Sequence, residues 1–227
     1  MGLTGKVYLV GAGPGDAGLL TMRGAELLRR ADVVVYDALV NRELLALAPE
    51  AAEVIFGGKR PREQAIPQEE LNRLLVDKAR DGKTVVRLKG GDPYIFGRGG
   101  EEAAGLKRDG VPFEVVPGIS SIIAAPSYAG IPLTSKDHRE VAVVTCDGTV
   151  DWSRYADERT LALLSGVGQI GEIAKQLNNI ITRDTMTIVP LVDRGRVSAA
   201  SNTLGGVILN TWDSELWNAA DWYRVKE

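Results

Sequence analysis

The chain has 227 residues, 44% of them apolar, which is enough to bury a substantial core in one large or two small domains. Its net charge of −3 argues against a general nucleic-acid-binding surface, and its single cysteine, Cys146, excludes an internal disulfide framework. One histidine, His138, cannot build a histidine-based metal site, so we expect no resident metal ion.

The sequence contains no candidate membrane segment. No apolar run approaches the roughly 20 residues that a membrane-spanning helix needs. The first residues lead into a predicted strand without the apolar core of a signal peptide. We therefore expect a cytoplasmic protein that binds neither membranes nor nucleic acids.

The first half of the chain alternates between short apolar runs and amphipathic segments. Strands are predicted at 6–10, 31–37, 54–56, 84–88 and 113–116, and helices at 19–30, 41–47, 67–80 and 99–108. Strands that alternate with helices are typical of a parallel sheet in an α/β fold.

The second half predicts another α/β layer. Residues 119–130 are rich in small side chains and read as a helix that Pro126 perturbs. Strands are predicted at 141–145, 161–164 and 187–192, with a helix at 170–176 between the last two. A proline–glycine pair, Pro117-Gly118, separates the two halves, so we predict domains of residues 1–116 and 117–227.

Two glycine-rich loops directly follow apolar strands. The first is Gly11-Ala12-Gly13-Pro14-Gly15-Asp16, and the second begins Gly90-Gly91-Asp92-Pro93. Glycines let backbone groups approach a ligand closely, and Pro93 stiffens the exit from the second loop. Each loop alone could be an ordinary strand-to-helix turn. Together they predict one ligand-binding cleft.

The first loop also invites a nicotinamide-dinucleotide interpretation, which its spacing does not favour. The third glycine comes one residue early, and Asp16 stands where a glycine is expected. A carboxylate at that place would repel a pyrophosphate. Dinucleotide binding therefore stays a remote alternative.

Charged residues mark two further candidate sites. Asp37 ends the second predicted strand, at the carboxyl edge where open α/β sheets place their ligands. The basic cluster Lys59, Arg60 and Arg62 could bind carboxylates, since the planar fork of arginine suits them, or it could be a solvated loop.

Five motifs together resemble the tetrapyrrole methyltransferases, and within that family the branch that C-methylates uroporphyrinogen III. They are Val7 to Asp16, Tyr36-Asp37-Ala38-Leu39-Val40, Ile66-Pro67-Gln68-Glu69-Glu70, Arg87 to Glu102, and Gly130-Ile131-Pro132-Leu133-Thr134. The resemblance implies two α/β domains with a cofactor cleft between them, and a homodimer. It implies S-adenosyl-L-methionine as methyl donor and two methylations of uroporphyrinogen III, through precorrin-1 to precorrin-2, for siroheme or cobalamin synthesis.

The resemblance also implies which residues contact the cofactor. The family's contacts fall on Pro14, Gly90, Gly91, Asp92, Phe96, Ser120 and Ser121, and on Ser165 and Pro190, where the family has methionine and alanine. Cys146 and Asp147 stand where the family usually has glycine and histidine. The basic cluster Lys59, Arg60 and Arg62 is then the expected contact for the macrocycle's carboxylates.

The implied chemistry needs little from the protein. A sulfonium methyl group is already activated, and the reduced pyrrole carbon is a good nucleophile, so the protein has to align the two and exclude water. Transfer leaves positive charge on the pyrrole nitrogen, and Asp37 is the candidate catalytic residue that stabilises or deprotonates it. Another tetrapyrrole substrate, or a non-catalytic tetrapyrrole-binding relative, remains an open alternative.

Overall fold

The structure is a computed structural model that describes residues 5–58, 66–155, 159–180, 188–190, 204–205 and 223–224. By its internal contacts the chain divides into two compact units, Met1–Ser120 and Ser121–Glu227, and we describe each unit separately. The domain boundary predicted between residues 116 and 117 stays a prediction. The basic cluster Lys59, Arg60 and Arg62 and the tryptophans Trp212, Trp217 and Trp222 lie outside the described residues.

The first unit is built on a parallel five-stranded sheet. Its strands are β1 (Lys6–Gly11), β2 (Val33–Tyr36), β3 (Glu53–Phe56), β4 (Thr84–Lys89) and β5 (Phe113–Val116). They lie in the order β3-β2-β4-β1-β5, and every pair is parallel. The parallel α/β architecture predicted from the alternating pattern is therefore confirmed.

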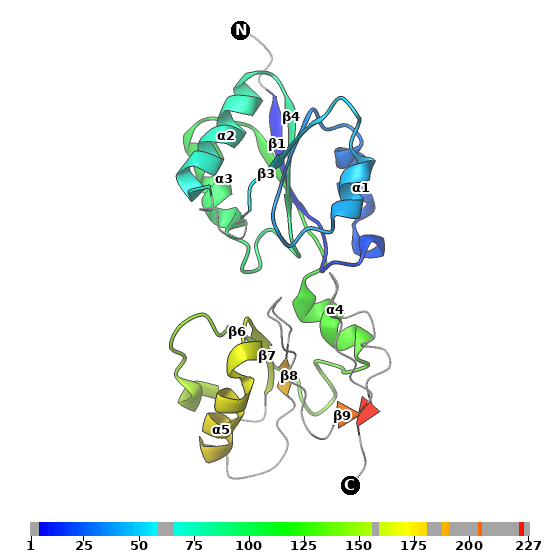
Figure 1. Ribbon diagram of the computed structural model, residues 1–227. Helices are drawn as coiled ribbons and strands as arrows, with labels where there is room; N and C mark the ends of the chain where they lie inside the picture. The colour runs from blue at the N-terminus through cyan, green and yellow to red at the C-terminus, as the bar shows by residue number, and fades with distance from the viewer. Residues whose placement is uncertain are drawn as a thin grey trace. The chain divides into compact units, whose positions relative to one another are not determined.

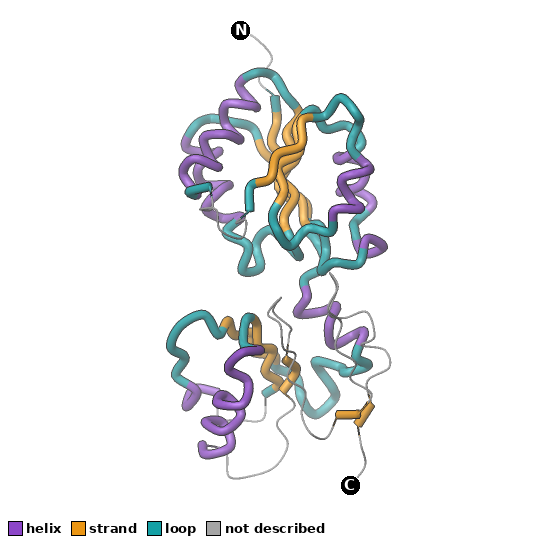
Figure 2. The backbone as a smooth tube through the Cα atoms, in the orientation of Figure 1, coloured by secondary structure: helices purple, strands orange, loops and turns teal. Residues whose placement is uncertain are grey.

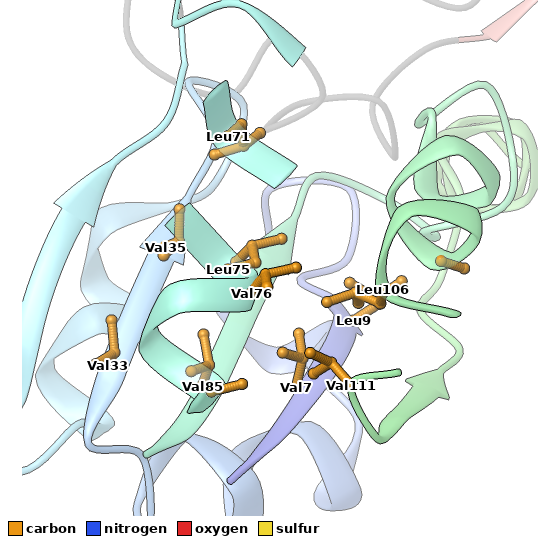
Figure 3. Packing of buried hydrophobic residues seen from close by; sticks show 12 residues of the cluster. Val7, Leu9, Val33, Val35, Leu71, Leu75, Val76, Val85, Leu106 and Val111 are labelled. Carbon is orange, nitrogen blue, oxygen red and sulfur yellow. The ribbon is translucent and has the colours of Figure 1, made fainter. Parts of the chain in front are cut away.

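Helices cover both faces of this sheet (Figures 1 and 2). Helices α2 (Gln68–Arg80) and α3 (Gly99–Arg108) lie on one face, and α1 (Met22–Leu28) lies on the other with the 3₁₀ helix η2 (Arg42–Leu47). Figure 3 shows the core under α2 and α3, where Leu71, Leu75 and Val76 of α2 pack over the strand residues Val7, Leu9, Val33, Val35 and Val85. Side chains alternate between faces along each strand, so the neighbouring strand positions face α1.

Strand order places the two glycine loops at a topological switch point. Strand β1 connects through α1 to β2, whereas the adjacent β4 connects through α3 to β5. Because α1 and α3 cover opposite faces, the loops leaving β1 and β4 diverge. Open α/β sheets bind ligands where such loops diverge at the carboxyl ends of the strands.

Two boundaries in this unit differ from the prediction. Helix α1 begins at Met22 instead of residue 19, because Ala17–Leu19 form a separate 3₁₀ helix capped by Asp16. Thr21 then caps α1 by accepting a hydrogen bond from Gly24 N. Strand β4 continues through Lys89, one residue beyond the predicted end at 88.

The second unit contains a smaller parallel sheet. Its strands β6 (Val141–Thr145), β7 (Thr160–Leu164) and β8 (Ile188–Pro190) lie in the order β6-β7-β8. Helices α4 (Ser121–Tyr128) and α5 (Ile170–Ile180) and the 3₁₀ helices η3 (Trp152–Tyr155) and η4 (Val167–Gln169) complete it, with a short antiparallel pair, β9 (Leu204–Gly205) and β10 (Tyr223–Arg224).

Helix α4 continues through Pro126, the residue that was predicted to perturb it. The helix loses the hydrogen bond that the missing N–H would make. Buried packing of Ile122 and Ala125 against Ala162 of β7 compensates for that loss. The turn after the proline is closed by Ala129 N, which donates to Ala125 O. Within the described part of the chain, no helix has the length and apolar character that crossing a bilayer requires.

Candidate functional site

The two glycine loops are hydrogen-bonded to each other at the switch point. Gly13 N donates to Gly91 O over 3.2 Å, and Gly91 N donates to Gly13 O over 2.7 Å. Ala12 N donates to Lys89 O, so the pairing of β1 with β4 extends past the strand ends. Gly13 and Gly91 both have positive φ, which glycine adopts without strain. This direct contact between the loops supports the prediction that they belong to one site.

A third glycine joins them from the end of β5. A Cβ atom on Gly118 would lie 2.2 Å from Gly91 O and 2.7 Å from Gly11 Cα. A Cβ atom on Gly11 would lie 2.5 Å from Gly118 Cα. No real side chain fits at such distances, so the backbones of three strand ends meet here only because positions 11 and 118 are glycine.

The side chain of Asp92 ties the same loops together. Its Oδ2 accepts a hydrogen bond from Gly118 N over 2.9 Å, and its Oδ1 accepts one from Tyr94 N over 2.8 Å. Both carboxylate oxygens of Asp92 therefore accept hydrogen bonds from backbone N–H groups. The predicted cofactor contact at Asp92 is then available through its own backbone, with the carboxylate acting as a brace.

Asp37 follows β2 at the same edge and is the exposed member of a buried ionic cluster. Arg87 Nη2 donates to Asp37 Oδ1 over 2.5 Å, and Lys89 Nζ lies 3.7 Å from Asp37 Oδ2. Both cations also contact one oxygen of Glu102 in α3, Arg87 Nε at 3.0 Å and Lys89 Nζ at 3.1 Å. We call these four residues the buried ion ring.

Burial distinguishes the members of the ring. The side chains of Arg87 and Lys89 are each 3% exposed, that of Glu102 is fully buried, and that of Asp37 is 26% exposed. Two cations and two anions balance, which is the condition for charges to be tolerated inside a protein. Only Asp37 reaches solvent.

Sequence reasoning missed Arg87, Lys89 and Glu102 as site residues, although a signal was present. Arg87 and Lys89 are two residues apart on a central strand, so they must share one face of the sheet. Two cations on a buried face require a buried anion. Glu102, which falls among the apolar positions Ala103 and Leu106 of α3, is the residue that fits.

Other predicted site residues of the first unit lie in or beside these loops. Pro14 is half-buried within the β1 loop. Phe96, in the β4 loop, has φ +51° and is 58% exposed; a left-handed backbone at a bulky residue is a strained feature that concentrates at functional sites. Ser120 is 8% exposed, and its Cα is the atom nearest to a Cβ built on Gly91, at 3.8 Å.

The remaining predicted contacts belong to the second unit. Ser121 begins α4. Ser165 directly follows β7 with φ +56°, and Pro190 is the last described residue of β8. Because β7 and β8 are parallel neighbours, Ser165 and Pro190 both stand at the carboxyl edge of the smaller sheet.

Cys146 is a structural residue in this fold. It packs with Val144, Trp152 and Leu161 and is 1% exposed. Burial, followed by the neighbouring charge of Asp147, raises the pKa of the Cys146 thiol, so the unreactive protonated form is favoured. Across the described residues, histidine, cysteine and carboxylate side chains form no group of three that could hold a metal ion.

The geometry first defines a class of protein. A parallel α/β sheet whose glycine loops meet at a switch point, beside a carboxylate, is a ligand-binding α/β fold of the open-sheet type. Comparison of the sequence with protein families then places it more narrowly. The sequence model of the tetrapyrrole (corrin/porphyrin) methylases matches residues 6–195, and the chain belongs to this family.

Individual relatives agree with that placement. The chain is 51% identical over 179 residues to the siroheme synthase of Yersinia pestis, a match that covers 76% of this chain and 38% of the relative. The chain thus spans about two fifths of the length of such curated relatives.

Two solved structures resemble this chain in both sequence and fold. The uroporphyrin-III C-methyl transferase of Thermus thermophilus complexed with S-adenyl homocysteine is 47% identical, with a TM-score of 0.66 over 79% of this chain and 78% of that chain. A cobalt precorrin-4 methyltransferase is 34% identical, with a TM-score of 0.69 over 77% of this chain and 74% of that one.

The contact of the three glycines predicts a steric effect on stability. Gly118→Ala should lower the free energy of unfolding by about 1–3 kcal/mol, because the added methyl group collides with backbone that cannot rotate away. Gly100→Ala is the matched control, since nothing lies within 4 Å of a Cβ there and alanine favours the helix. Denaturant unfolding measures both, and equal stability of the two variants would contradict the close contact.

Proposed function

We propose that this chain is an S-adenosyl-L-methionine-dependent methyltransferase that C-methylates uroporphyrinogen III, through precorrin-1, to precorrin-2. The observation that carries the proposal is the 47% identity to a uroporphyrin-III C-methyl transferase whose structure holds S-adenyl homocysteine. The family match includes both glycine loops and Asp37. As part of the same proposal, the protein is a cytoplasmic homodimer.

The glycine loops suit the cofactor's part of the site. Gly90 and Gly91 carry no side chains that would keep a ligand away from the end of β4. We assign the cofactor contacts to Pro14, Gly90, Gly91, Asp92, Phe96, Ser120 and Ser121, and to Ser165 and Pro190 of the second unit. The chemistry the cofactor supplies is a methyl group on a positively charged sulfur.

Asp37 suits the substrate's part of the site. When the new C–C bond forms and the S–CH₃ bond breaks, the sulfonium charge is lost and positive charge develops on the pyrrole nitrogen. A carboxylate placed at the edge of the sheet stabilises that charge or accepts the proton that leaves. Its 26% exposure leaves Asp37 accessible while its cationic partners stay buried.

The basic cluster fits the acidic substrate. Lys59 directly follows Gly58, and a Cβ atom on Gly58 would lie 2.7 Å from Ala38 N, next to Asp37. Gly58, the last described residue before the cluster, therefore lies close to the chain that carries Asp37. Guanidinium and ammonium groups are suited to the macrocycle's carboxylates.

A second candidate substrate is another reduced tetrapyrrole of the cobalamin series. The similarity to a cobalt precorrin-4 methyltransferase favours it, because that structure superposes with a TM-score of 0.69 at 34% identity. The higher identity to the uroporphyrin-III enzyme ranks uroporphyrinogen III first.

Turnover tests the proposal directly. Purified protein incubated with methyl-labelled cofactor and uroporphyrinogen III should give dimethylated product, whereas Asp37→Asn should lower kcat by about 10²-fold or more, the scale of losing one positioned acid–base or charge-stabilising group. Calorimetry should find its affinity for S-adenosylhomocysteine unchanged. If the methyl group were transferred only to another tetrapyrrole, that tetrapyrrole would be the substrate in place of uroporphyrinogen III. If the protein bound the cofactor but methylated no tetrapyrrole, it would be a non-catalytic relative.

Cofactor binding should depend on the glycine at position 91. Gly91→Ala adds a methyl group facing Ser120, and we expect affinity for S-adenosylhomocysteine to fall at least about tenfold, or about 1.4 kcal/mol. Gly110→Ala is the matched control, because Gly110 has φ +69°, close to the +66° of Gly91, and nothing lies within 4 Å of its Cβ. The two variants should lose similar stability, and equal calorimetric affinities would refute the assignment.

The basic cluster should affect the macrocycle and not the cofactor. Replacing Lys59, Arg60 and Arg62 together by glutamine should raise the KM for uroporphyrinogen III at least about tenfold, since several charge-assisted hydrogen bonds are lost. The KM for the cofactor should change little. If both constants moved together, or neither did, the cluster would be a solvated loop.

A further inference from the structure

The guanidinium of Arg87 bridges the two anions of the buried ion ring. Its Nε donates to Glu102 Oε1 over 3.0 Å, and its Nη2 donates to Asp37 Oδ1 over 2.5 Å. Its remaining nitrogen, Nη1, donates to the backbone oxygens of Val35 and Leu88. All three nitrogens are engaged, so the plane of the group is fixed.

The anchor of this bridge is Glu102. Its Oε1 accepts from Arg87, from Lys89 Nζ over 3.1 Å and from Gln68 Nε2 over 3.5 Å. Its Oε2 is buried with no hydrogen-bond partner, alone among the buried side-chain polar atoms of the described residues. Oε1 of Glu102 thus accepts hydrogen bonds from three donors, whereas Oε2 accepts none.

Such an arrangement is not explained by stability. Burying ions costs free energy, and apolar residues in place of a buried ion pair are often as stable or more so. The sheet face that carries Arg87 also carries Val85 and lies under Leu71 and Leu75 of α2, so apolar packing was available. An unpartnered buried carboxylate oxygen is a further cost that calls for another reason.

We propose that Arg87, anchored by Glu102, is a positioning residue that holds the Asp37 carboxylate in one orientation, an inference that rests on the proposed function. Asp37 is the only ring member with substantial exposure, so its outer surface is the end that meets substrate. Oδ1 is held by Arg87, while Oδ2 is 3.7 Å from Lys89, outside hydrogen-bond range. Oδ2 is therefore the oxygen that acts on the substrate.

The discriminating variant is Arg87→Lys. Lysine keeps the positive charge but lacks the planar fork, so it cannot bridge Glu102 and Asp37 together. We expect kcat to fall at least about tenfold, because small misplacements of a reacting group are costly. The KM for the macrocycle and the affinity for S-adenosylhomocysteine should stay within about twofold, since binding groups are untouched.

A double-mutant cycle separates positioning from a general structural effect. In an Asp37→Asn background, Arg87→Lys should cause no further loss of kcat, because the group it positions is already gone. An equal loss in both backgrounds, or no loss in either, overturns the proposal. Glu102→Gln preserves shape and provides a second, milder test that should show the same dependence on Asp37.

The control for replacing an arginine is Arg80→Lys. Arg80 ends α2, is 54% exposed and pairs with Asp109, so it makes no contact with the ring. Its replacement should leave kcat, KM and melting temperature unchanged. A change as large as that of Arg87→Lys would show that the effect is not specific to the ring.

A crystal structure of Arg87→Lys tests the inference without turnover. Asp37 should adopt a different or a second orientation there, and an unmoved Asp37 overturns the proposal. This measurement separates two failures. If the wild-type protein transferred no methyl group, the proposed function would fall, while the crystallographic result would still decide whether Arg87 orients Asp37.

Discussion

The organisation of the first unit depends on the close approach of backbones at Gly11, Gly91 and Gly118. These residues end or follow three adjacent strands, and neither Gly11 nor Gly118 leaves room for a Cβ atom beside the backbone of Gly91. The loops that leave β1 and β4 lead to helices on opposite faces of the sheet, and they are hydrogen-bonded to each other where they leave the strands. Asp92 then braces the assembly through backbone N–H groups on both sides. The edge that results is rigid and carries exposed backbone, which is what a small-molecule site requires.

The buried ion ring places an oriented charge beside that edge. Strand β4 supplies the two cations of the ring and leads directly into the second glycine loop, since Arg87 and Lys89 precede Gly90 and Gly91 in the chain. The strand therefore couples the orientation of Asp37 to the position of the second glycine loop, and both depend on the pairing of β4 with β1 and β2. Burying these four paired charges adds little net stability. The effect of the ring is to orient Asp37, because a guanidinium held at three nitrogens has one orientation.

The sequence predicted most of this fold and, at the candidate site, the places of the glycine loops and Asp37 but not the buried ion ring. Apolar runs separated by capped helices located every strand of the first sheet, because period and turn chemistry are local signals. The glycine loops and Asp37 were found from their places after strands. Glu102 was not, since its role arises only when α3 packs over β4 and brings residues 15 apart in sequence into contact. The start of α1 was misplaced because Asp16 caps a separate 3₁₀ helix first. Helix α4 continues past Pro126 because tertiary packing outweighs a local propensity.

Four departures from the pattern that the family resemblance implies lie in the second unit. Cys146 and Asp147 follow β6, Ser165 follows β7, and Pro190 ends β8, so all four stand at the carboxyl edge of the second unit's sheet. The first unit keeps the glycine loops and Asp37 that the family pattern contains. If the proposed function holds, the charge chemistry assigned to Asp37 is retained. Under the proposed cofactor contacts at Ser165 and Pro190, any effect of these departures should appear in the affinity for the methyl donor.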